Sequence, residues 1–223
     1  MRRKSLHSAY MQQPEQLPFD CVIPCAGLSS RMKVWKPLTT YRGRPLIFSS
    51  IENALASCSR IILVTGFRAA ELEEMVKQEY GVSSRIQLAR NREYERGMFS
   101  SIQTGAARTR SRWFFVALGD MPAIPPRLYF RLAEWTNSSA VSDTPYDIIR
   151  PFHRGQPAHP VLLHNRVVQT LIKMPAAATM QTMFSLHRAQ TGGGIMEIET
   201  DEAGSRIDID TSEDLQKLQP QEE

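Results

Sequence analysis

The sequence predicts an α/β fold with a mostly parallel sheet and helices on both of its faces. Short apolar runs recur along the chain, as at 60–65 and 113–118, and such runs are typical of strands that are buried on both faces. Segments with helical spacing of apolar residues separate these runs. Strands that alternate with helices in this way favour parallel pairing through crossover connections.

The first half of the chain alternates strand and helix after a leader without periodicity. Residues 1–18 carry Gln, Pro and charge, and we expect them to form a flexible leader. The run from Phe19 to Pro24 predicts the first strand. Pro45 opens a helix that extends to residue 57, because a proline in the first helical turn loses no hydrogen bond. We then expect a buried strand at 60–65, a helix over 69–80 from the spacing of Leu72, Met75 and Val76, and a strand at 85–89.

The second half continues the alternation and then becomes less regular. A helix is expected from residue 97 to about 110, and the strand at 113–118 stops at Gly119-Asp120. Strands at 147–152 and 160–163 can pair across the turn at 155–157, which predicts a small antiparallel extension. The remaining predicted elements are a helix over 125–135, a polar linker at 137–145, a helix over 165–174, a strand at 195–199, and a helix capped by Thr211 or Ser212. We predict a single domain over 19–219.

Composition limits the function without deciding it. The formal charge of +4 and the isoelectric point of about 9.1 suit an anionic ligand or a nucleic acid. No platform of aromatic and basic residues supports binding to nucleic acid, which is therefore disfavoured. We expect a soluble, cytoplasmic protein, because no run approaches the ~20 apolar residues of a membrane helix and no signal peptide is recognisable. Cys21, Cys25 and Cys58 have no C-x-x-C spacing and are expected to be buried thiols in a reducing compartment.

The loop after the first strand predicts an anion site. Its small residues, Gly27 among them, let backbone N–H groups approach an anion closely. Arg31, Lys33 and Lys36 supply positive charge. An ordinary strand-to-helix connection has a similar composition, so this loop alone favours neither interpretation.

Three acidic residues can add a metal site to this anion site. Asp120 directly follows a buried strand, where a parallel sheet would hold Mg²⁺ against bound phosphates. Alternation places Asp208 and Asp210 on one face of a strand, and either can provide a second metal ligand. The alternative is that Ile207 and Ile209 face the core while the acids face water.

Five segments of the chain resemble, in the same order, the motifs of the MobA-like nucleotidyltransferases. The first resembles the family loop A-A-G-x-S-x-R-M-G-x-x-K-x-L, and the others resemble the segments N…G-M-S-S-S-I, G-D-M-P, G-x-P-G-H-P and D-T-P-E-D-L. Together they extend from about residue 19 to residue 215. The matching segments are P-C-A-G-L-S-S-R-M with K-P-L over 24–38, Asn91 with G-M-F-S-S-I over 97–102, G-D-M-P over 119–122, G-Q-P-A-H-P over 155–160, and D-T-S-E-D-L over 210–215.

Within that group, the segment with His159-Pro160 is most similar to the molybdenum cofactor cytidylyltransferases. The resemblance implies a Rossmann-like domain that binds CTP and Mg²⁺, transfers CMP to the terminal phosphate of molybdopterin and releases pyrophosphate. It also implies delivery of the finished cofactor to a molybdenum hydroxylase. Guanylyl-transferring relatives usually have L-A-G-G in the first loop, so Ala26 favours cytidine.

The resemblance implies a role for each matching residue. Arg31 and Lys36 bind the triphosphate and act in catalysis with Asp120. Asp120 and Asp210 hold the metal, and His159 contacts the acceptor. The residues implied in nucleotide binding are Cys25, Ala26, Gly27, Ser29, Asn91, Gly97 and Ser101.

Departures from the family pattern leave two alternatives open. Lys33 replaces a glycine, Phe99 replaces a small residue, and Cys25 replaces an alanine in a segment that also resembles the P-A-A-G of isoprenoid-pathway cytidylyltransferases. The first alternative is a cytidylyl- or guanylyltransferase that acts on another phosphorylated acceptor. The second is a chaperone that binds a nucleotide or cofactor without transferring it.

Overall fold

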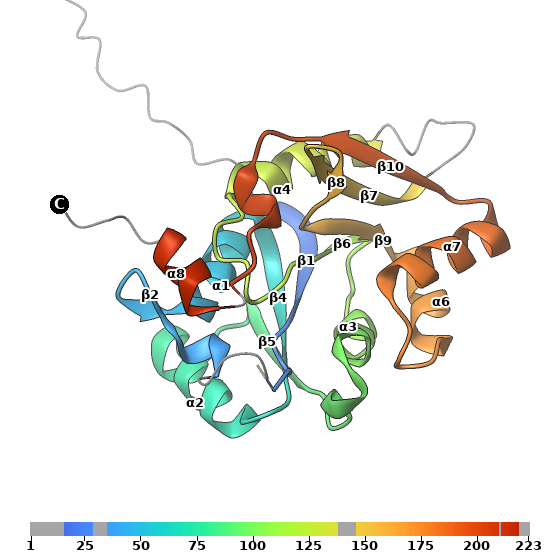
Figure 1. Cartoon of the computed structure of the whole chain (residues 1–223). Helices are drawn as coiled ribbons and strands as arrows, with labels where there is room; N and C mark the ends of the chain where they lie inside the picture. The colour runs from blue at the N-terminus through green and yellow to red at the C-terminus, as the bar shows by residue number, and fades with distance from the viewer. Residues whose placement is uncertain (1–15, 29–34, 138–145, 210, 219–223) are drawn as a thin grey trace, which may run out of the picture.

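An eight-stranded sheet forms the centre of the fold (Figure 1). The structure is a computed structural model, and it describes residues 16–28, 35–137, 146–209 and 211–218. The strand order is β10-β7-β9-β6-β1-β4-β5, with β8 paired to β7. The strands are β1 (Leu17–Pro24), β4 (Cys58–Thr65), β5 (Ile86–Arg90), β6 (Trp113–Val116), β7 (Tyr146–His153), β8 (Gln156–Pro157), β9 (Val161–His164) and β10 (Gly194–Glu199), and a separate hairpin joins β2 (Thr40–Tyr41) to β3 (Arg44–Pro45).

The sheet is mostly parallel, as the sequence predicts. Strand β1 pairs in parallel with β4 and β6, and β4 pairs in parallel with β5. Strand β9 runs antiparallel to both β6 and β7, and Ile148 lies opposite Leu163 in the second of these pairs. The predicted pairing of 147–152 with 160–163 is therefore confirmed as the small antiparallel extension.

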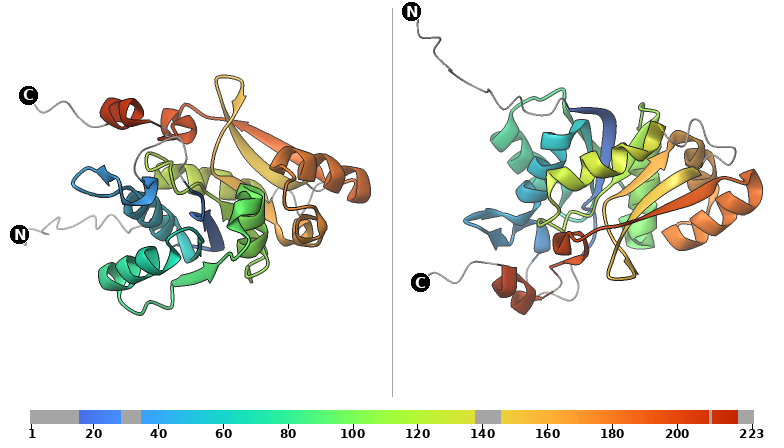
Figure 2. Two further views of the ribbon diagram at one scale, coloured as in Figure 1. Left: turned by 60° about the horizontal axis from the view of Figure 1, so that its bottom comes forward. Right: turned by 90° about the horizontal axis from the view of Figure 1, so that it is seen from above.

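Helices cover both faces of the sheet because successive strand residues point to opposite sides. Cys21 and Ile23 of β1 belong to one apolar cluster with α1, α2 and α4, whereas Val22 belongs to a second cluster with α3, α6 and α7. Figures 1 and 2 show the two groups of helices on either side of the sheet. The helices are α1 (Leu46–Ser57), α2 (Ala69–Tyr80), α3 (Met98–Ala106), α4 (Pro126–Ala133), α6 (Val168–Lys173), α7 (Met180–Thr191) and α8 (Ser212–Leu218), with short 3₁₀ turns at η1 (Lys36–Leu38), η2 (Tyr94–Arg96), η3 (Asn165–Val167) and η4 (Ala203–Arg206).

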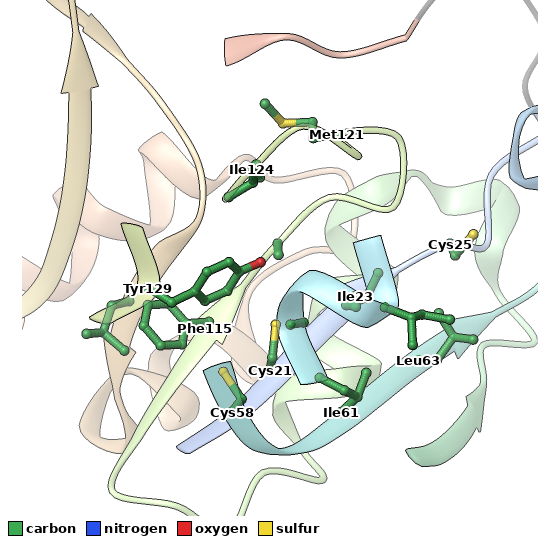
Figure 3. Close-up of a cluster of buried hydrophobic side chains, with 14 of the residues drawn as sticks. Cys21, Ile23, Cys25, Cys58, Ile61, Leu63, Phe115, Met121, Ile124 and Tyr129 are labelled. Carbon is green, nitrogen blue, oxygen red and sulfur yellow. The ribbon is translucent and has the colours of Figure 1, made fainter. Parts of the chain in front are cut away.

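The cysteines are buried free thiols, as predicted. Figure 3 shows Cys21 and Cys58 in the first cluster, close to the aromatic rings of Phe115 and Tyr129. These two rings pack with their centroids 4.9 Å apart. Burial raises the pKa of the Cys25 and Cys58 thiols, which keeps them protonated and unreactive.

Two parts of the fold are absent from the sequence prediction. Helix α7 was not predicted, although Thr179 caps it by accepting a hydrogen bond of 3.1 Å from the Thr182 N–H. The β2–β3 hairpin was not predicted either. By contrast, the cap of α8 is confirmed, because the Thr211 hydroxyl accepts a bond of 3.2 Å from the Asp214 N–H. Within the described part of the chain, the helices are too short or too polar to cross a membrane.

We expect the change Gly105→Ala to destabilise the fold by about 1–3 kcal/mol. Helix α3 lies so close to the sheet at Gly105 that an added Cβ would meet Val22 Cγ1 at 2.3 Å and Val64 Cγ2 at 3.0 Å. Urea unfolding measures the free-energy change. Gly27→Ala is the matched control, because its Cβ meets no atom within 4 Å. Equal stability of the two variants would contradict this account of the α3 contact.

Candidate active site

A cavity of about 550 Å³ lies at the carboxyl ends of β1 and β6. Its lining comes from segments that are far apart in the sequence: 24–28, 36–37, Leu46, parts of 94–101, 118–120 and Asp208. The segments 24–28 and 118–120 contain the two loops that the sequence places directly after strands. Parallel sheets generally bind ligands at this position, so the cavity is the candidate active site.

Lys36 and Asp120 face each other in this cavity. Lys36 Nζ lies 3.4 Å from Asp120 Oδ2, and the two side chains are 12% and 26% exposed. Burial raises the pKa of Asp120, Lys36 opposes this shift, and the nearby Asp208 raises the pKa further. Asp120 and Asp208 thus form an acidic pair beside one partly buried cation, and a bound cation would stabilise this pair.

The loop that carries Asp120 is held on several sides. The Ser50 hydroxyl donates to the Gly119 carbonyl at 3.1 Å, and the Asn53 side chain donates to the Pro122 carbonyl at 2.9 Å. The Ile209 N–H donates to the Asp120 carbonyl at 3.0 Å. Figure 3 also shows two further residues of this loop, Met121 and Ile124, and both are buried in the first cluster. Asp120 is thus presented by a rigid support, as a functional carboxylate requires.

The loop after β1 is anchored on the neighbouring strand. The Cys25 N–H donates to the Val64 carbonyl at 2.8 Å, and the Phe67 N–H donates to the Ala26 carbonyl at 3.0 Å. The next two N–H groups, of Gly27 and Leu28, donate to no acceptor among the described residues. The predicted anion site therefore has N–H groups that a phosphate can use.

Two further contacts hold the loop after β1 in position, one at Gly66 and one at Trp35. Gly66 packs so tightly that an added Cβ would lie 2.6 Å from the Ala26 Cβ and 2.7 Å from the Tyr94 Cβ. The Trp35 indole N–H donates to the Gly27 carbonyl at 3.4 Å, which joins the loop to the start of η1. Lys36 follows Trp35 directly, so these contacts also position its side chain.

Asn91 and Ser101 have different places in the site. Ser101 and Gly97 line the cavity, whereas Asn91 is 4% exposed and is not among the lining residues. The Asn91 side-chain N–H₂ donates to Ser101 Oγ at 3.0 Å and to Ser100 Oγ at 2.9 Å. Its direct contact with a nucleotide stays a prediction, and the structure shows that it holds Ser101 in place.

The structure brings together seven of the predicted site residues in one cavity and places another in a second cavity. Cys25, Ala26, Gly27, Gly97, Ser101 and the Lys36–Asp120 pair share the first cavity, whereas His159 lines an adjoining cavity of about 580 Å³. Ser29, Arg31 and Asp210 lie outside the described residues.

Several cavity residues were not selected from the sequence. Asp208 lies in the cavity, although Asp210 was chosen as the second metal ligand. Tyr94 and Glu95 also line the cavity, and their position between Asn91 and the 97–102 motif was the available signal. Met98 and Leu118 carried no chemical signal, because apolar residues beside helix and strand ends are usual in any α/β core.

The comparisons with known proteins identify the family. A family model for the MobA-like NTP transferase domain matches residues 21–191. The chain belongs to this family. Members of the MobA-like NTP transferase family are nucleotidyltransferases, and this chain is one of them.

Known relatives of this MobA-like NTP transferase extend over most of its length. It is 33% identical over 196 residues to the molybdenum cofactor cytidylyltransferase of Escherichia coli K12, covering 88% of this chain and 93% of that protein. The structure of a nucleotidyl transferase from Methanothermobacter matches with a TM-score of 0.72 and 19% identity, covering 90% of this chain and 95% of the other. The structure of Rv0371c from Mycobacterium tuberculosis H37Rv matches with a TM-score of 0.70 and 18% identity. The match covers 91% of this chain and 98% of the other. These two structural matches confirm the nucleotidyltransferase-like α/β fold.

Proposed function

We propose that this enzyme transfers CMP from CTP to the terminal phosphate of molybdopterin and releases pyrophosphate. The observation that carries the proposal is the Lys36–Asp120 pair, which shares one cavity with the open N–H groups of Gly27 and Leu28. The relative from Escherichia coli, whose name gives the cytidylyl reaction, supports the choice of substrates. Delivery of the product to a molybdenum hydroxylase, which the resemblance implies, stays a prediction.

The nucleotide would lie with its triphosphate between the first loop and Asp120. Lys36 supplies positive charge from within the cavity, and Arg31, outside the described residues, is proposed to add a second cation. The N–H groups of Gly27 and Leu28 can donate to phosphate oxygens. Ser101, held by Asn91, is proposed to contact the ribose or base.

A Mg²⁺ ion fits the acidic side of this cavity. Asp208 lies near enough to raise the pKa of Asp120, and a divalent cation would offset this repulsion. The described residues contain no group of three or more His, Cys, Asp or Glu side chains that could hold a metal ion. Mg²⁺ is usually bound by one or two carboxylates plus substrate phosphates, so two carboxylates are enough. We propose Asp120 as one ligand and Asp208 or Asp210 as the other; when bound, Mg²⁺ would neutralise negative charge on the phosphates.

The residues of the site would act by alignment and charge. A terminal phosphate oxygen of the acceptor attacks the α-phosphorus of CTP, and the bond from that phosphorus to pyrophosphate breaks. Lys36 neutralises charge on the phosphates during this displacement. The anchored 25–28 and 119–122 loops keep the two ends of the nucleotide in fixed positions, which lowers the entropic cost of in-line attack.

A pyrophosphate-release assay with the four NTPs tests this function. We expect release with CTP and molybdopterin to be at least about tenfold faster than with GTP, ATP or UTP, because a site that pairs with the base discriminates strongly. Sugar phosphates and methylerythritol phosphate serve as rival acceptors. Preference for another acceptor would replace molybdopterin in the proposal. Nucleotide binding without any pyrophosphate would instead favour the chaperone alternative.

A further inference from the structure

A third apolar cluster joins the C-terminal helix to the rim of the active-site cavity. It contains Tyr41 of the β2–β3 hairpin, Leu46 at the start of α1, and Ile209, and each of these residues is at most 2% exposed. Leu215 and Leu218 of α8 pack against it, and Figure 1 shows α8 beside the hairpin. The third cluster shares no residue with the two large clusters on the sheet, so α8 lies outside the main core.

Two members of the third cluster connect it directly to the active site. Leu46 lines the active-site cavity. The Ile209 N–H donates to the Asp120 carbonyl at 3.0 Å, and Asp208, the residue before Ile209, lines the same cavity. Ile209 is fully buried, whereas Asp208 is exposed. The cluster therefore holds the residue that follows Asp208 and leaves the carboxylate itself open to the cavity.

The segment before Asp208 is held against the loop that carries Asp120. Gly204 packs so closely on this loop that an added Cβ would lie 2.1 Å from the Ala123 carbonyl oxygen. The next residue is also fixed, because the His159 N–H donates to the Ser205 carbonyl at 2.8 Å. Asp208 thus lies between two anchored points, the 204–205 turn on one side and the third cluster on the other.

Helix α8 begins with a reciprocal cap just after this segment. The Thr211 hydroxyl accepts a bond of 3.2 Å from the Asp214 N–H, and the Asp214 carboxylate accepts bonds from the Thr211 N–H at 2.9 Å and from its hydroxyl at 2.8 Å. A helix of seven residues still depends on tertiary contacts for its stability. The contacts of Leu215 and Leu218 with the third cluster therefore keep α8 in place.

We propose that α8 is a clamp for the metal-binding side of the active site, with Leu215 as a positioning residue for Asp208. The leucines of α8 hold Ile209 in the third cluster, and the bond from Ile209 to Asp120 then keeps Asp208 beside that carboxylate. This inference rests on the proposed function, because it concerns the Mg²⁺ that the reaction would use. It selects Asp208 as the second ligand, and it makes α8 a support of the site although none of its described residues lines either cavity.

Leu215→Asn tests the clamp in the full-length protein, because it keeps the size of the side chain and removes its apolar character. Titration with Mn²⁺ alone, followed by the EPR signal of the free ion, measures metal affinity without turnover. We expect Leu215→Asn to raise the Kd for Mn²⁺ at least about tenfold, which is about 1.4 kcal/mol. Leu186→Asn is the matched control, at an exposed leucine that lines neither cavity, and should leave this Kd unchanged.

A double variant shows whether Leu215 acts through Asp208. Asp208→Asn alone should also raise the Kd for Mn²⁺, because it removes the carboxylate that the clamp positions. Adding Leu215→Asn to Asp208→Asn should weaken binding no further, since two changes that act through one group are not additive. Leu215→Met keeps the apolar contact and should bind Mn²⁺ like the wild type. Additive effects of the two asparagine substitutions would contradict the proposal.

Turnover and unfolding separate the clamp from the proposed function and from a general loss of stability. With CTP and molybdopterin, Leu215→Asn should raise the KM for Mg²⁺ at least about tenfold, and saturating Mg²⁺ should restore kcat to within about threefold of the wild type. Its urea midpoint should stay close to that of the wild type, and a large loss of stability would contradict a role confined to the site.

The outcomes of the metal titration and of the transfer assay are independent. If no CMP is transferred but the Mn²⁺ titrations behave as described, the proposed function fails and the clamp stands. If CMP is transferred but Leu215→Asn leaves the Kd for Mn²⁺ and the KM for Mg²⁺ unchanged, the clamp is wrong and the proposed function stands.

Discussion

Replacing Asp120 with asparagine is expected to lower kcat at least about a hundredfold, with the fold intact. The substitution keeps the shape of the side chain and removes the negative charge that faces Lys36 at 3.4 Å and that we propose holds Mg²⁺. The loop should keep its conformation, because its bonds from Ser50 and Ile209 go to backbone carbonyls and not to this carboxylate. Steady-state pyrophosphate release measures the change.

Lys36→Ala should cause a loss of similar size, because it removes the partly buried cation of the same site. The matched control for the aspartate is Asp201→Asn, at an exposed acid that lines neither cavity. Its rate should equal that of the wild type. Unfolding midpoints close to the wild type in all three variants show that lost rate is not lost fold. Rates like that of the wild type in both Asp120→Asn and Lys36→Ala would contradict the assignment of this cavity as the active site.

The placement of the site could be predicted from the sequence because its signals are local. Apolar runs that end in Gly27 or in Gly119-Asp120 indicate where strands stop, and in a parallel sheet those ends lie together. The continuous apolar runs at 60–65 and 113–118 likewise indicate strands that are buried on both faces, and therefore helices on both faces of the sheet. Both expectations agree with the observed register and with the two apolar clusters.

Burial and pairing of single residues could not be predicted in the same way. Asn91 belongs to a recognisable motif, yet its position behind Ser101 follows from the packing of α3 on the strands. Asp208 and Asp210 are equivalent in the alternating pattern, and the bond from Ile209 to Asp120 brings Asp208 into the cavity. Such distinctions depend on contacts between distant segments, which leave no periodic signal.

Helix α7 shows a further limit of the sequence pattern. Its buried residues Met183, Phe184 and His187 form a narrow stripe, and most of its other residues are polar. The stripe is stabilised by tertiary contacts, such as the 2.9 Å bond between His187 Nε2 and the buried Asp147. The helix, which lines the adjoining cavity, was therefore missed because its stability comes mainly from packing and not from propensity.

Asp20→Ala is expected to lower the free energy of unfolding at neutral pH by about 3–5 kcal/mol, the usual cost of breaking a buried ion pair from one side. Asp20 is 3% exposed and accepts two bonds of 2.8 Å from the Arg60 guanidinium. It also accepts bonds from the Arg110 and Ser111 N–H groups at 2.6 and 3.1 Å. The substitution leaves all of these donors without their acceptor. Urea unfolding at pH 7 gives the size of the loss.

The pH dependence of that loss identifies its electrostatic origin. Burial alone would raise the pKa of Asp20, but the Arg60 guanidinium and the two backbone N–H groups hold it below the usual value. A carboxyl whose folded pKa lies below its unfolded pKa stabilises the protein fully above that unfolded value, about 3.9, and this stabilisation is lost as the pH falls through the folded pKa. The difference in free energy of unfolding between wild type and Asp20→Ala should therefore be largest at neutral pH and shrink below about pH 4.

Glu71→Ala is the control, because it breaks an exposed ion pair, the one with Arg68. It should lower the free energy of unfolding by no more than about 1 kcal/mol at pH 7. A difference for Asp20→Ala that stays constant down to pH 2 would show that lost packing, and not lost charge, causes the effect.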